Sequence, residues 1–318
     1  MQAIASVAGA RWESAPGGGS DWSRFGGVCG LTAIAATITV ASIQPGEPDA
    51  MTTRAVRGAP PAETMPIDPV WAFGAYGGAA HTYPATVKIA REDEQMTASG
   101  FDWIGKPFEA PIYYGARIQR WGMLGRTGGM LDFIHAKAIA KPDSTATFTG
   151  TRNGQALPRS APVRDVFNKI EFSHGHNILT LNGLLRLGSL FGFLRPYAGV
   201  GGGITLPHVE VGFKGENWRT YEYKFAGFAG QALAGLEFDL GRTSLFVEYK
   251  FTYAPYDLPL TEEPELDILV LDVWRQFQAW WAGAKPRGGR LTVNLATHHG
   301  VAGFLVKSHL TRPVVPVR

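Results

Sequence analysis

Apolar and polar residues alternate with a period of two along much of the chain after residue 70. In the segment LFVEYKFTY, Leu245, Val247 and Tyr249 fall on one face, whereas Glu248 and Lys250 fall on the other. Because successive side chains of a β-strand point to opposite faces, this pattern predicts a strand with one apolar and one charged face. The alternation predicts eight strands, at residues 70–82, 111–121, 129–140, 177–187, 195–211, 221–240, 243–256 and 289–307.

The connections between these segments alternate in length. Those at 122–128, 188–194 and 241–242 are short, whereas those at 83–110, 141–176, 212–220 and 257–288 are long. Bacterial outer-membrane barrels place short turns in the periplasm and long loops outside the cell. We therefore expect an all-β fold, namely an eight-stranded antiparallel transmembrane β-barrel in the outer membrane.

The charged strand faces are expected to point into the lumen of this barrel. Side chains fill the interior of an eight-stranded barrel, so a general porin is not expected. Glu248 and Lys250 share the inner face of one strand, and we expect them to form structural ion pairs with Arg117, Asp132 or Arg186.

The last long connection contains a pattern of helical period. Val270, Trp274, Phe277 and Trp281 recur every three to four residues, which predicts a short amphipathic helix. Such a helix could lie on the lipid surface, cover the barrel mouth or simply pack as part of the loop.

The first 69 residues differ in composition from the rest. Arg24 precedes the apolar run FGGVCGLTAIAATITVASI, so residues 1–43 are expected to be a signal segment, with an uncleaved signal anchor as the alternative. Residues 44–69 are rich in Pro, Ala and Thr and are expected to be a disordered linker, followed by the barrel at 70–307 and a tail at 308–318. The single cysteine, Cys29, lies in the signal segment, so no disulfide or zinc–thiolate site is expected in the mature chain.

Charge and composition limit the classes of partner that we expect for this chain. The formal net charge is only +3, which suits anionic lipid but not nucleic acid. The 40 glycines and many aromatic residues fit strands that are apolar on one face, and they fit a soluble β-sandwich equally well. The outer-membrane location therefore depends on the alternation and on the connection lengths.

Histidines are the candidates for chemistry. In an up-and-down barrel, five of them fall toward the extracellular rim: His81, His135, His174, His176 and His208. Glu210 lies two residues after His208 on a predicted strand, so both side chains share a face and could bind one ion or transfer protons. Histidines at loop ends are also common without any function. The glycine run GVGGG opens no helix, so no flavin or nicotinamide site is indicated.

Several stretches together resemble the lipid A oxidase family of outer-membrane barrels found in rhizobia and their relatives. They are FGAYGGAAHTYP, GKPFEAPIYYGAR, LDFIHAKAIA, FSHGHNILTLNGLLR, RPYAGVGGGITLPHVEV and FVEYKFTY, which together extend over residues 70–306. The Trp-rich connection and the C-terminal tail depart from the pattern of that family.

This resemblance implies an oxygen-dependent reaction at the extracellular side of the outer membrane, with lipid A of lipopolysaccharide as the partner. The proximal glucosamine of lipid A would be converted to 2-aminogluconate with O2 as co-substrate and hydrogen peroxide as by-product. Because such oxidation ordinarily needs a redox cofactor, a divalent first-row metal ion is expected. The candidate catalytic residues are Asp132, His135, His176, His208, Glu210 and Glu248, of which His135, His208 and Glu210 are the candidate metal ligands; Asn177, Lys137 and Lys250 are candidates for binding the substrate.

Two other functions remain open at this point. A non-enzymatic small barrel, structural or adhesin-like, would not need the rim histidines. A lipid A acyl hydrolase would need a serine–histidine pair, for which Ser173 beside His174 is the candidate.

Overall fold

A computed structural model describes residues 71–91, 94–122, 125–261, 268–284 and 288–308. The predicted signal segment, the predicted linker and all of the predicted tail except Ser308 lie outside the described residues. None of the helices among the described residues is long and apolar enough to cross a membrane.

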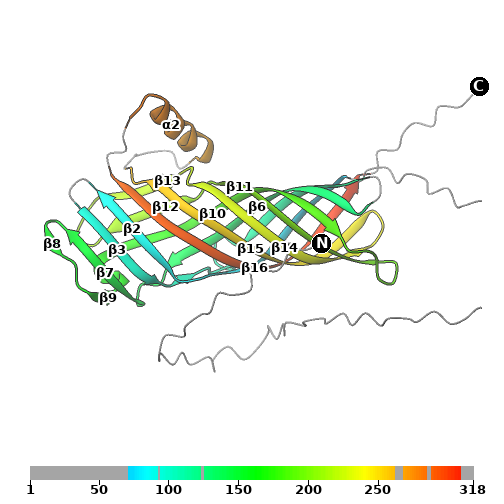
Figure 1. Ribbon diagram of the computed structural model, residues 1–318, viewed down its shortest axis with the longest axis horizontal. Coiled ribbons are helices and arrows are strands. Elements are labelled where there is room, and N and C mark those ends of the chain that lie inside the picture. The colour runs from blue at the N-terminus through cyan, green and yellow to red at the C-terminus, as the bar shows by residue number, and fades with distance from the viewer. Residues whose placement is uncertain (1–70, 92–93, 123–124, 262–267, 285–287, 309–318) are drawn as a thin grey trace, which may run out of the picture. The chain divides into compact units, whose positions relative to one another are not determined.

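Eight long strands form a closed antiparallel ring (Figure 1). Each strand pairs with its neighbour along the ring, and the last strand pairs again with the first. In ring order they are β1 (Trp71–Thr82), β5 (Tyr114–Trp121), β6 (Thr127–Ala140), β10 (Phe167–Arg186), β11 (Leu194–Thr205), β14 (Gly227–Asp239), β15 (Thr243–Pro259) and β16 (Arg290–Ser308). Each of the eight predicted segments contributes a strand to this ring.

The register of the strands fixes the width of the ring. A path of directly paired residues that leaves Ala72 returns to β1 at Thr82, ten residues further along the same strand. This stagger requires the strands to tilt, and eight strands at such a tilt enclose a space that side chains fill. The interior is therefore expected to be filled by side chains, as it was from the number of strands predicted from the sequence.

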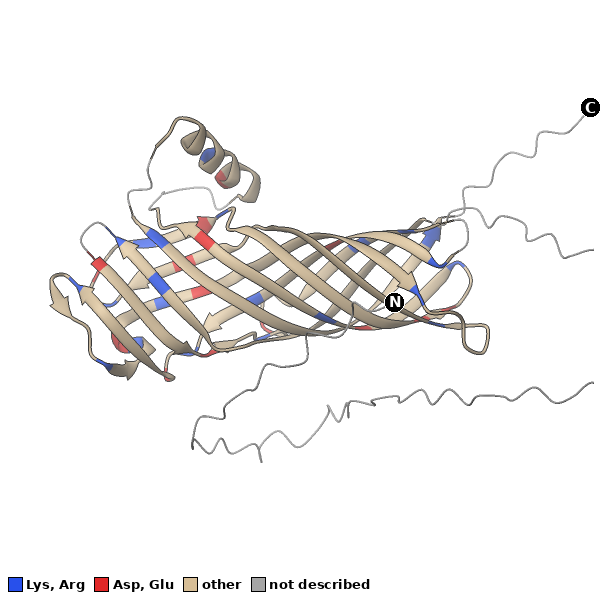
Figure 2. Ribbon diagram, viewed as in Figure 1, with Lys and Arg blue, Asp and Glu red and all other residues tan. Residues whose placement is uncertain are grey.

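The two faces of the ring differ as the alternation predicts. Burial alternates residue by residue along β15. The outer face carries an apolar belt, which we define as the exposed side chains of Phe73, Ile118, Leu131, Leu181, Val200, Leu236, Leu245, Val247, Phe304 and Val306. Most charged residues lie toward the two ends of the strands (Figure 2).

Shorter strands extend the sheet beyond one end of the ring. β2 (Ala85–Arg91) pairs with β16, β3 (Glu94–Phe101) pairs with β2, and β7 (Thr145–Arg152) pairs with β3. β12 (His208–Phe213) pairs with β10 and with β13 (Arg219–Tyr223). The small elements β4 (Trp103–Ile104), β8 (Gln155–Ala156), β9 (Ser160–Pro162) and α1 (Val163–Val166) complete this extension.

The extension corrects the predicted strand boundaries. The connections 83–110 and 141–176 were expected to be loops, but they contain β2, β3 and β7, and β10 begins ten residues before position 177. The predicted strands 195–211 and 221–240 are each divided in two. Pro207, which has no backbone N–H, separates β11 from β12, and Gly227 begins β14 with a φ of 112° that favours glycine.

The predicted helix is α2 (Leu269–Trp281), which lies beside the outer wall and does not cover the end of the ring (Figure 1). Its Gln276 side chain accepts a hydrogen bond from the Phe225 N–H at 2.7 Å and donates one to the Phe225 carbonyl at 3.0 Å. The Tyr223 N–H donates to Asp272 at 3.1 Å. α2 is therefore attached by three hydrogen bonds to the backbone of the last residue of β13 and of the β13–β14 connection.

Candidate functional site

Four charged side chains form an ion cluster inside the ring: Arg117, Asp132, Glu248 and Lys250. All four side chains are fully buried. Arg117 Nη2 lies 2.6 Å from Glu248 Oε1, and Lys250 is paired with Asp132. With two acids and two bases the interior ion cluster has no net formal charge, which limits the cost of burying it.

Neutral groups complete the hydrogen bonding of the interior ion cluster. The Tyr76 hydroxyl donates to Asp132 at 3.0 Å, Tyr197 donates to Glu248 at 2.6 Å, and Gln231 donates to Asp132 at 3.1 Å. The predicted structural ion pairs with Arg117 and Asp132 are confirmed, whereas Arg186 pairs instead with Glu237 at 2.6 Å. The candidate site residues Asp132, Glu248 and Lys250 therefore lie where a substrate outside the ring does not reach them.

Two histidines also face the interior, nearer the extension. His176 Nδ1 lies 2.5 Å from the Tyr256 hydroxyl. His299 Nδ1 lies 3.1 Å from the Tyr113 hydroxyl, and its Nε2 lies 3.0 Å from Thr252 Oγ1. Both histidines are fully buried, so the candidate catalytic residue His176 belongs to the core of the ring.

A different pair of candidate residues meets on the outer face. Tyr114, His135 and Asn177 lie directly opposite one another on β5, β6 and β10, and directly opposite residues share a face. Tyr114 is exposed, whereas His135 and Asn177 are buried, at 4% and 3% exposure. The His135 ring stacks on Tyr114 with 4.5 Å between centroids. His135 Nδ1 lies 2.8 Å from Asn177 Oδ1. We call these three residues the outer histidine patch.

The hydrogen bonds of the outer histidine patch fix the protonation of the imidazole. The Asn177 amide nitrogen donates to the Leu206 carbonyl at 3.1 Å, so its amide oxygen faces His135. An amide oxygen can only accept, so Nδ1 of His135 carries the hydrogen and Nε2 keeps its lone pair. Within the described residues, Nε2 has no hydrogen-bond partner. Lys137, two residues along the same strand, donates to the Glu109 carbonyl at 2.8 Å.

The candidate residues on β12 lie in the extension. His208 packs among aromatic rings, with centroid distances of 4.8 Å to His174, 4.6 Å to Tyr221 and 4.8 Å to Tyr223. Glu210, two residues further, bonds to Lys169 at 3.1 Å and to Arg219 at 3.4 Å.

Burial and charge act in opposite directions on the pair formed by Glu210 and Lys169. Burial raises the pKa of Glu210 above its ordinary value, despite the hydrogen bond from Lys169 that lowers it. Burial would lower the pKa of Lys169, but its hydrogen bond to Glu210 and the nearby Glu171 raise that pKa.

The three candidate metal ligands occupy different settings. His135 is bonded to Asn177, His208 is packed among rings and Glu210 is paired with two cations. Among the residues that the structure describes, no group of three or more His, Cys, Asp or Glu side chains could hold a metal ion. The metal ion thus stays a prediction from the sequence.

The serine considered for acyl hydrolysis also has a partner. The Ser173 hydroxyl donates to Glu171 at 2.8 Å, and His174 Nδ1 lies 3.4 Å away. Because the single hydroxyl proton points to the carboxylate, His174 is not placed to accept it.

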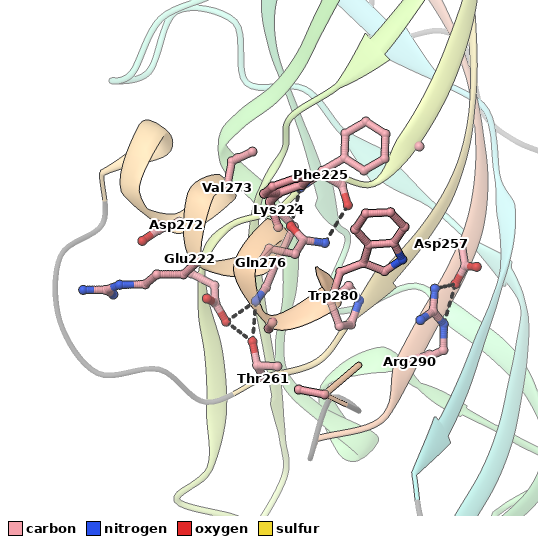
Figure 3. Close-up of a pocket in the computed structure, with 16 residues that line it drawn as sticks. Glu222, Lys224, Phe225, Asp257, Thr261, Asp272, Val273, Gln276, Trp280 and Arg290 are labelled. Atoms are coloured by element: carbon pink, nitrogen blue, oxygen red, sulfur yellow. Dashed lines mark hydrogen bonds and ion pairs between the residues drawn. The ribbon is translucent and has the colours of Figure 1, made fainter. Parts of the chain in front are cut away.

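A pocket of about 950 Å³ lies between α2 and the strand ends, and we call it the α2 pocket. Its lining includes Glu222, Lys224, Asp257, Trp280 and Arg290. Lys224 lies 2.6 Å from Glu222, and Arg290 lies 2.8 Å from Asp257. Figure 3 shows Trp280 of the helix between Gln276 and the Asp257–Arg290 pair of the strands.

No protein-family model matches this chain, and no curated protein matches it either. The functional interpretation therefore depends on the residues and their geometry.

One group of polar side chains on the outer face was not predicted from the sequence. His298 Nε2 lies 2.7 Å from the Tyr83 hydroxyl, its Nδ1 is bonded to the Tyr249 hydroxyl, and His81 packs edge-on against Tyr83. The signal in the sequence was that His298 falls on the outward-facing side of the alternation in 289–307, whereas its neighbour His299 falls on the inward-facing side.

Proposed function

We propose that the ring is a β-barrel of the bacterial outer membrane. The apolar belt supports this proposal, because its outward residues on β15 are apolar or aromatic from Leu245 to Tyr253, nine residues. A tilted strand crosses a bilayer in about 9–11 residues. On β10 the corresponding segment runs from Asn177 to Arg186, so the extension, including Lys169 and β12, would stand outside the bilayer.

For a barrel in the outer membrane, we propose that the protein is a lipid A oxidase. The outer histidine patch carries the proposal, because its exposed Tyr114 lies on the outer face at the edge of the apolar belt nearer the extension, with the buried His135 stacked against it. Lipid A sugars occupy that height if the extension points out of the cell. Lys137 beside the patch is 5% exposed and bonded to the Glu109 carbonyl, and we propose that it turns to a phosphate or a sugar hydroxyl when the substrate binds.

The proposed reaction oxidises C1 of the proximal glucosamine, which bears a free hydroxyl once its phosphate is gone. The C1–H bond gives up two electrons, the hydroxyl loses its proton, and O2 is reduced to hydrogen peroxide with both hydrogens. The resulting lactone adds water and opens to 2-aminogluconate.

His135 is the proposed base for the hydroxyl proton. Its Nε2 has a lone pair and no partner among the described residues, and Asn177 holds the ring in the required tautomer. Because Nε2 is buried, the proposal requires the side chains that cover it to move aside when the sugar binds. Electron transfer to oxygen ordinarily uses a redox cofactor, for which a divalent first-row metal is proposed. The described residues do not provide a fitting set of ligands for it, so we derive no step through it.

Mass spectrometry of lipid A from cells with and without the protein tests this function. One added oxygen on the proximal sugar, absent when air is excluded, is the expected result. Loss of an acyl chain would instead indicate a hydrolase, and an unchanged spectrum would indicate a structural barrel.

Two variants test the site separately from the function. We expect His135→Gln to reduce the initial rate of oxidation at least about a hundredfold, the lower end of general-base contributions, and so to lower the oxidised fraction. His81→Gln, which also lies on the outer face, should leave the fraction unchanged. If His135→Gln retains full oxidation while His208→Ala abolishes it, the base is assigned to the wrong histidine.

A further inference from the structure

We propose that the α2 pocket binds a saccharide ring. In the membrane this ring would belong to the sugar portion of lipopolysaccharide, an assignment that rests on the proposed function. The saccharide chemistry itself is argued from the lining of the pocket alone.

The charges of the pocket favour a neutral occupant. Among the described residues, three acids and three bases line it: Glu222, Asp257, Asp272, Lys224, Arg275 and Arg290. Two acid–base pairs within this set are in direct contact, at 2.6 Å and 2.8 Å. The described part of the lining has no net formal charge, so it offers hydrogen-bond donors and acceptors but no excess attraction for a free anion such as phosphate.

The aromatic wall favours a sugar over a simple polar ligand. Phe225, Phe277 and Trp280 line the pocket, and the rings of Phe277 and Trp280 lie 5.8 Å apart. The face of an aromatic ring is electron-rich, so it attracts the C–H groups on one side of a sugar ring. The hydroxyl groups around the edge of the sugar can then bond to the carboxylates and guanidinium groups of the strands.

The volume and position of the pocket agree with such a ligand. About 950 Å³ lies within the range of roughly 300–1,000 Å³ that is usual for small-molecule sites. The lining includes Gly227 and Pro259, which lie beyond Phe228 and Tyr253 toward the extension, and both of these aromatic residues are exposed on the outer face. The headgroup of a lipid whose chains contact the apolar belt would thus be level with the pocket.

Titration of the purified full-length chain in detergent micelles tests the proposal. The probe is the soluble β-1,6-linked glucosamine disaccharide, followed by tryptophan fluorescence and calorimetry, with inorganic phosphate as the comparison. We expect saturable binding of the disaccharide that phosphate does not displace. Absence of saturable binding, or equal binding of phosphate, would overturn the proposal.

Two tryptophans of α2 provide a matched pair of variants. Both are exposed, Trp280 at 69% and Trp281 at 78%, but only Trp280 lines the pocket. We expect Trp280→Ala to weaken disaccharide binding at least about tenfold, as loss of a central aromatic contact does, and Trp281→Ala to bind like the wild type. Equal weakening by both variants would place the ligand on the helix surface and contradict the proposal.

A third variant covers the case in which Trp280→Ala does not fold. The Asp257–Arg290 pair is half-exposed, so Asp257→Asn should leave folding intact and still weaken binding. Unchanged affinity in Asp257→Asn would show that the strand side of the pocket does not contact the disaccharide.

The lipid A spectrum separates the two proposals: disaccharide binding without oxidation refutes only the oxidase, and oxidation without disaccharide binding refutes only the pocket.

Discussion

At the scale of single residues, the interior ion cluster depends on each of its four members. Lys250 Nζ contacts Asp132 and also donates to the Tyr76 hydroxyl at 2.7 Å, in a space closed to solvent. Replacing one member removes its charge but leaves the charge of its partner buried. The destabilisation should therefore exceed the strength of any one contact.

Lys250→Met should lower the free energy of unfolding by about 3 kcal/mol, because Asp132 loses its nearest cation in a buried site. Chemical unfolding in lipid vesicles measures this. The control is Lys106→Met, whose pair with Glu109 is largely exposed and should contribute less than about 1 kcal/mol. Adding Asp132→Leu should recover part of the loss, and a double variant less stable than Lys250→Met would contradict the explanation.

Glu210 gives a dependence on pH. Because its pKa is raised in the folded state by burial, ionisation of Glu210 disfavours the fold as the pH rises from the ordinary carboxyl pKa through the raised one. Glu210→Gln lacks this ionisation. The melting temperature of the wild type minus that of Glu210→Gln should therefore fall across this interval, as measured by thermal unfolding at a series of pH values. A difference that grows as the pH rises would show that the ion pairs of Glu210 outweigh its burial.

At the scale of strands, position on the outer face decides what a substitution does. Leu181 is 67% exposed at mid-height of the apolar belt, whereas Leu240 is 62% exposed in the turn between β14 and β15. In a bilayer, Leu181→Arg should cost about 2–4 kcal/mol of unfolding free energy, and Leu240→Arg should change it by less than about 0.5 kcal/mol. Unfolding in vesicles compares them. Equal stability of both variants would exclude lipid contact at Leu181.

The strands of the ring could be predicted because each has one apolar and one polar face. The extension was missed for a physical reason: β2 also alternates, with Val87 and Ile89 buried, but it has only seven residues and joins the ring through β16, which is far away in sequence. The same limit applies to the candidate site. Arg117 and Glu248 meet across the interior from β5 and β15, which are not neighbours in the ring, so their contact follows from the ten-residue stagger.

The prediction that several histidines gather at the rim was also wrong for one of them. His176 and His135 were both expected at the rim, and their positions along the strands agree with that. However, His176 lies directly opposite Ala136 and shares the face of Thr180 and Asn182, so it faces the interior while His135 faces outward. Height along a strand therefore did not decide the face, which the alternation of the side chains sets.

At the scale of the whole molecule, the ring has two unlike ends. One end has the short turns, and the other has the extension with an apolar core that includes Phe101, Phe148 and Phe213. A core of this kind lets the extension keep its shape in water without support from lipid. The proposed function needs this end to face out of the cell, where lipid A sugars are, and that orientation can be tested without any assay of activity.

Two exposed serines mark the two ends and allow a nearly isosteric change. Ser160 lies on β9 in the extension, and Ser189 lies in the short connection between β10 and β11. The native Cys29 falls in the predicted signal segment, so the mature wild type should not react. A membrane-impermeant maleimide applied to intact cells should label Ser160→Cys and not Ser189→Cys, while both should react after lysis. Labelling of Ser189→Cys alone on intact cells would show that the short turns face out of the cell. The outer histidine patch would then not lie in the leaflet that holds lipid A.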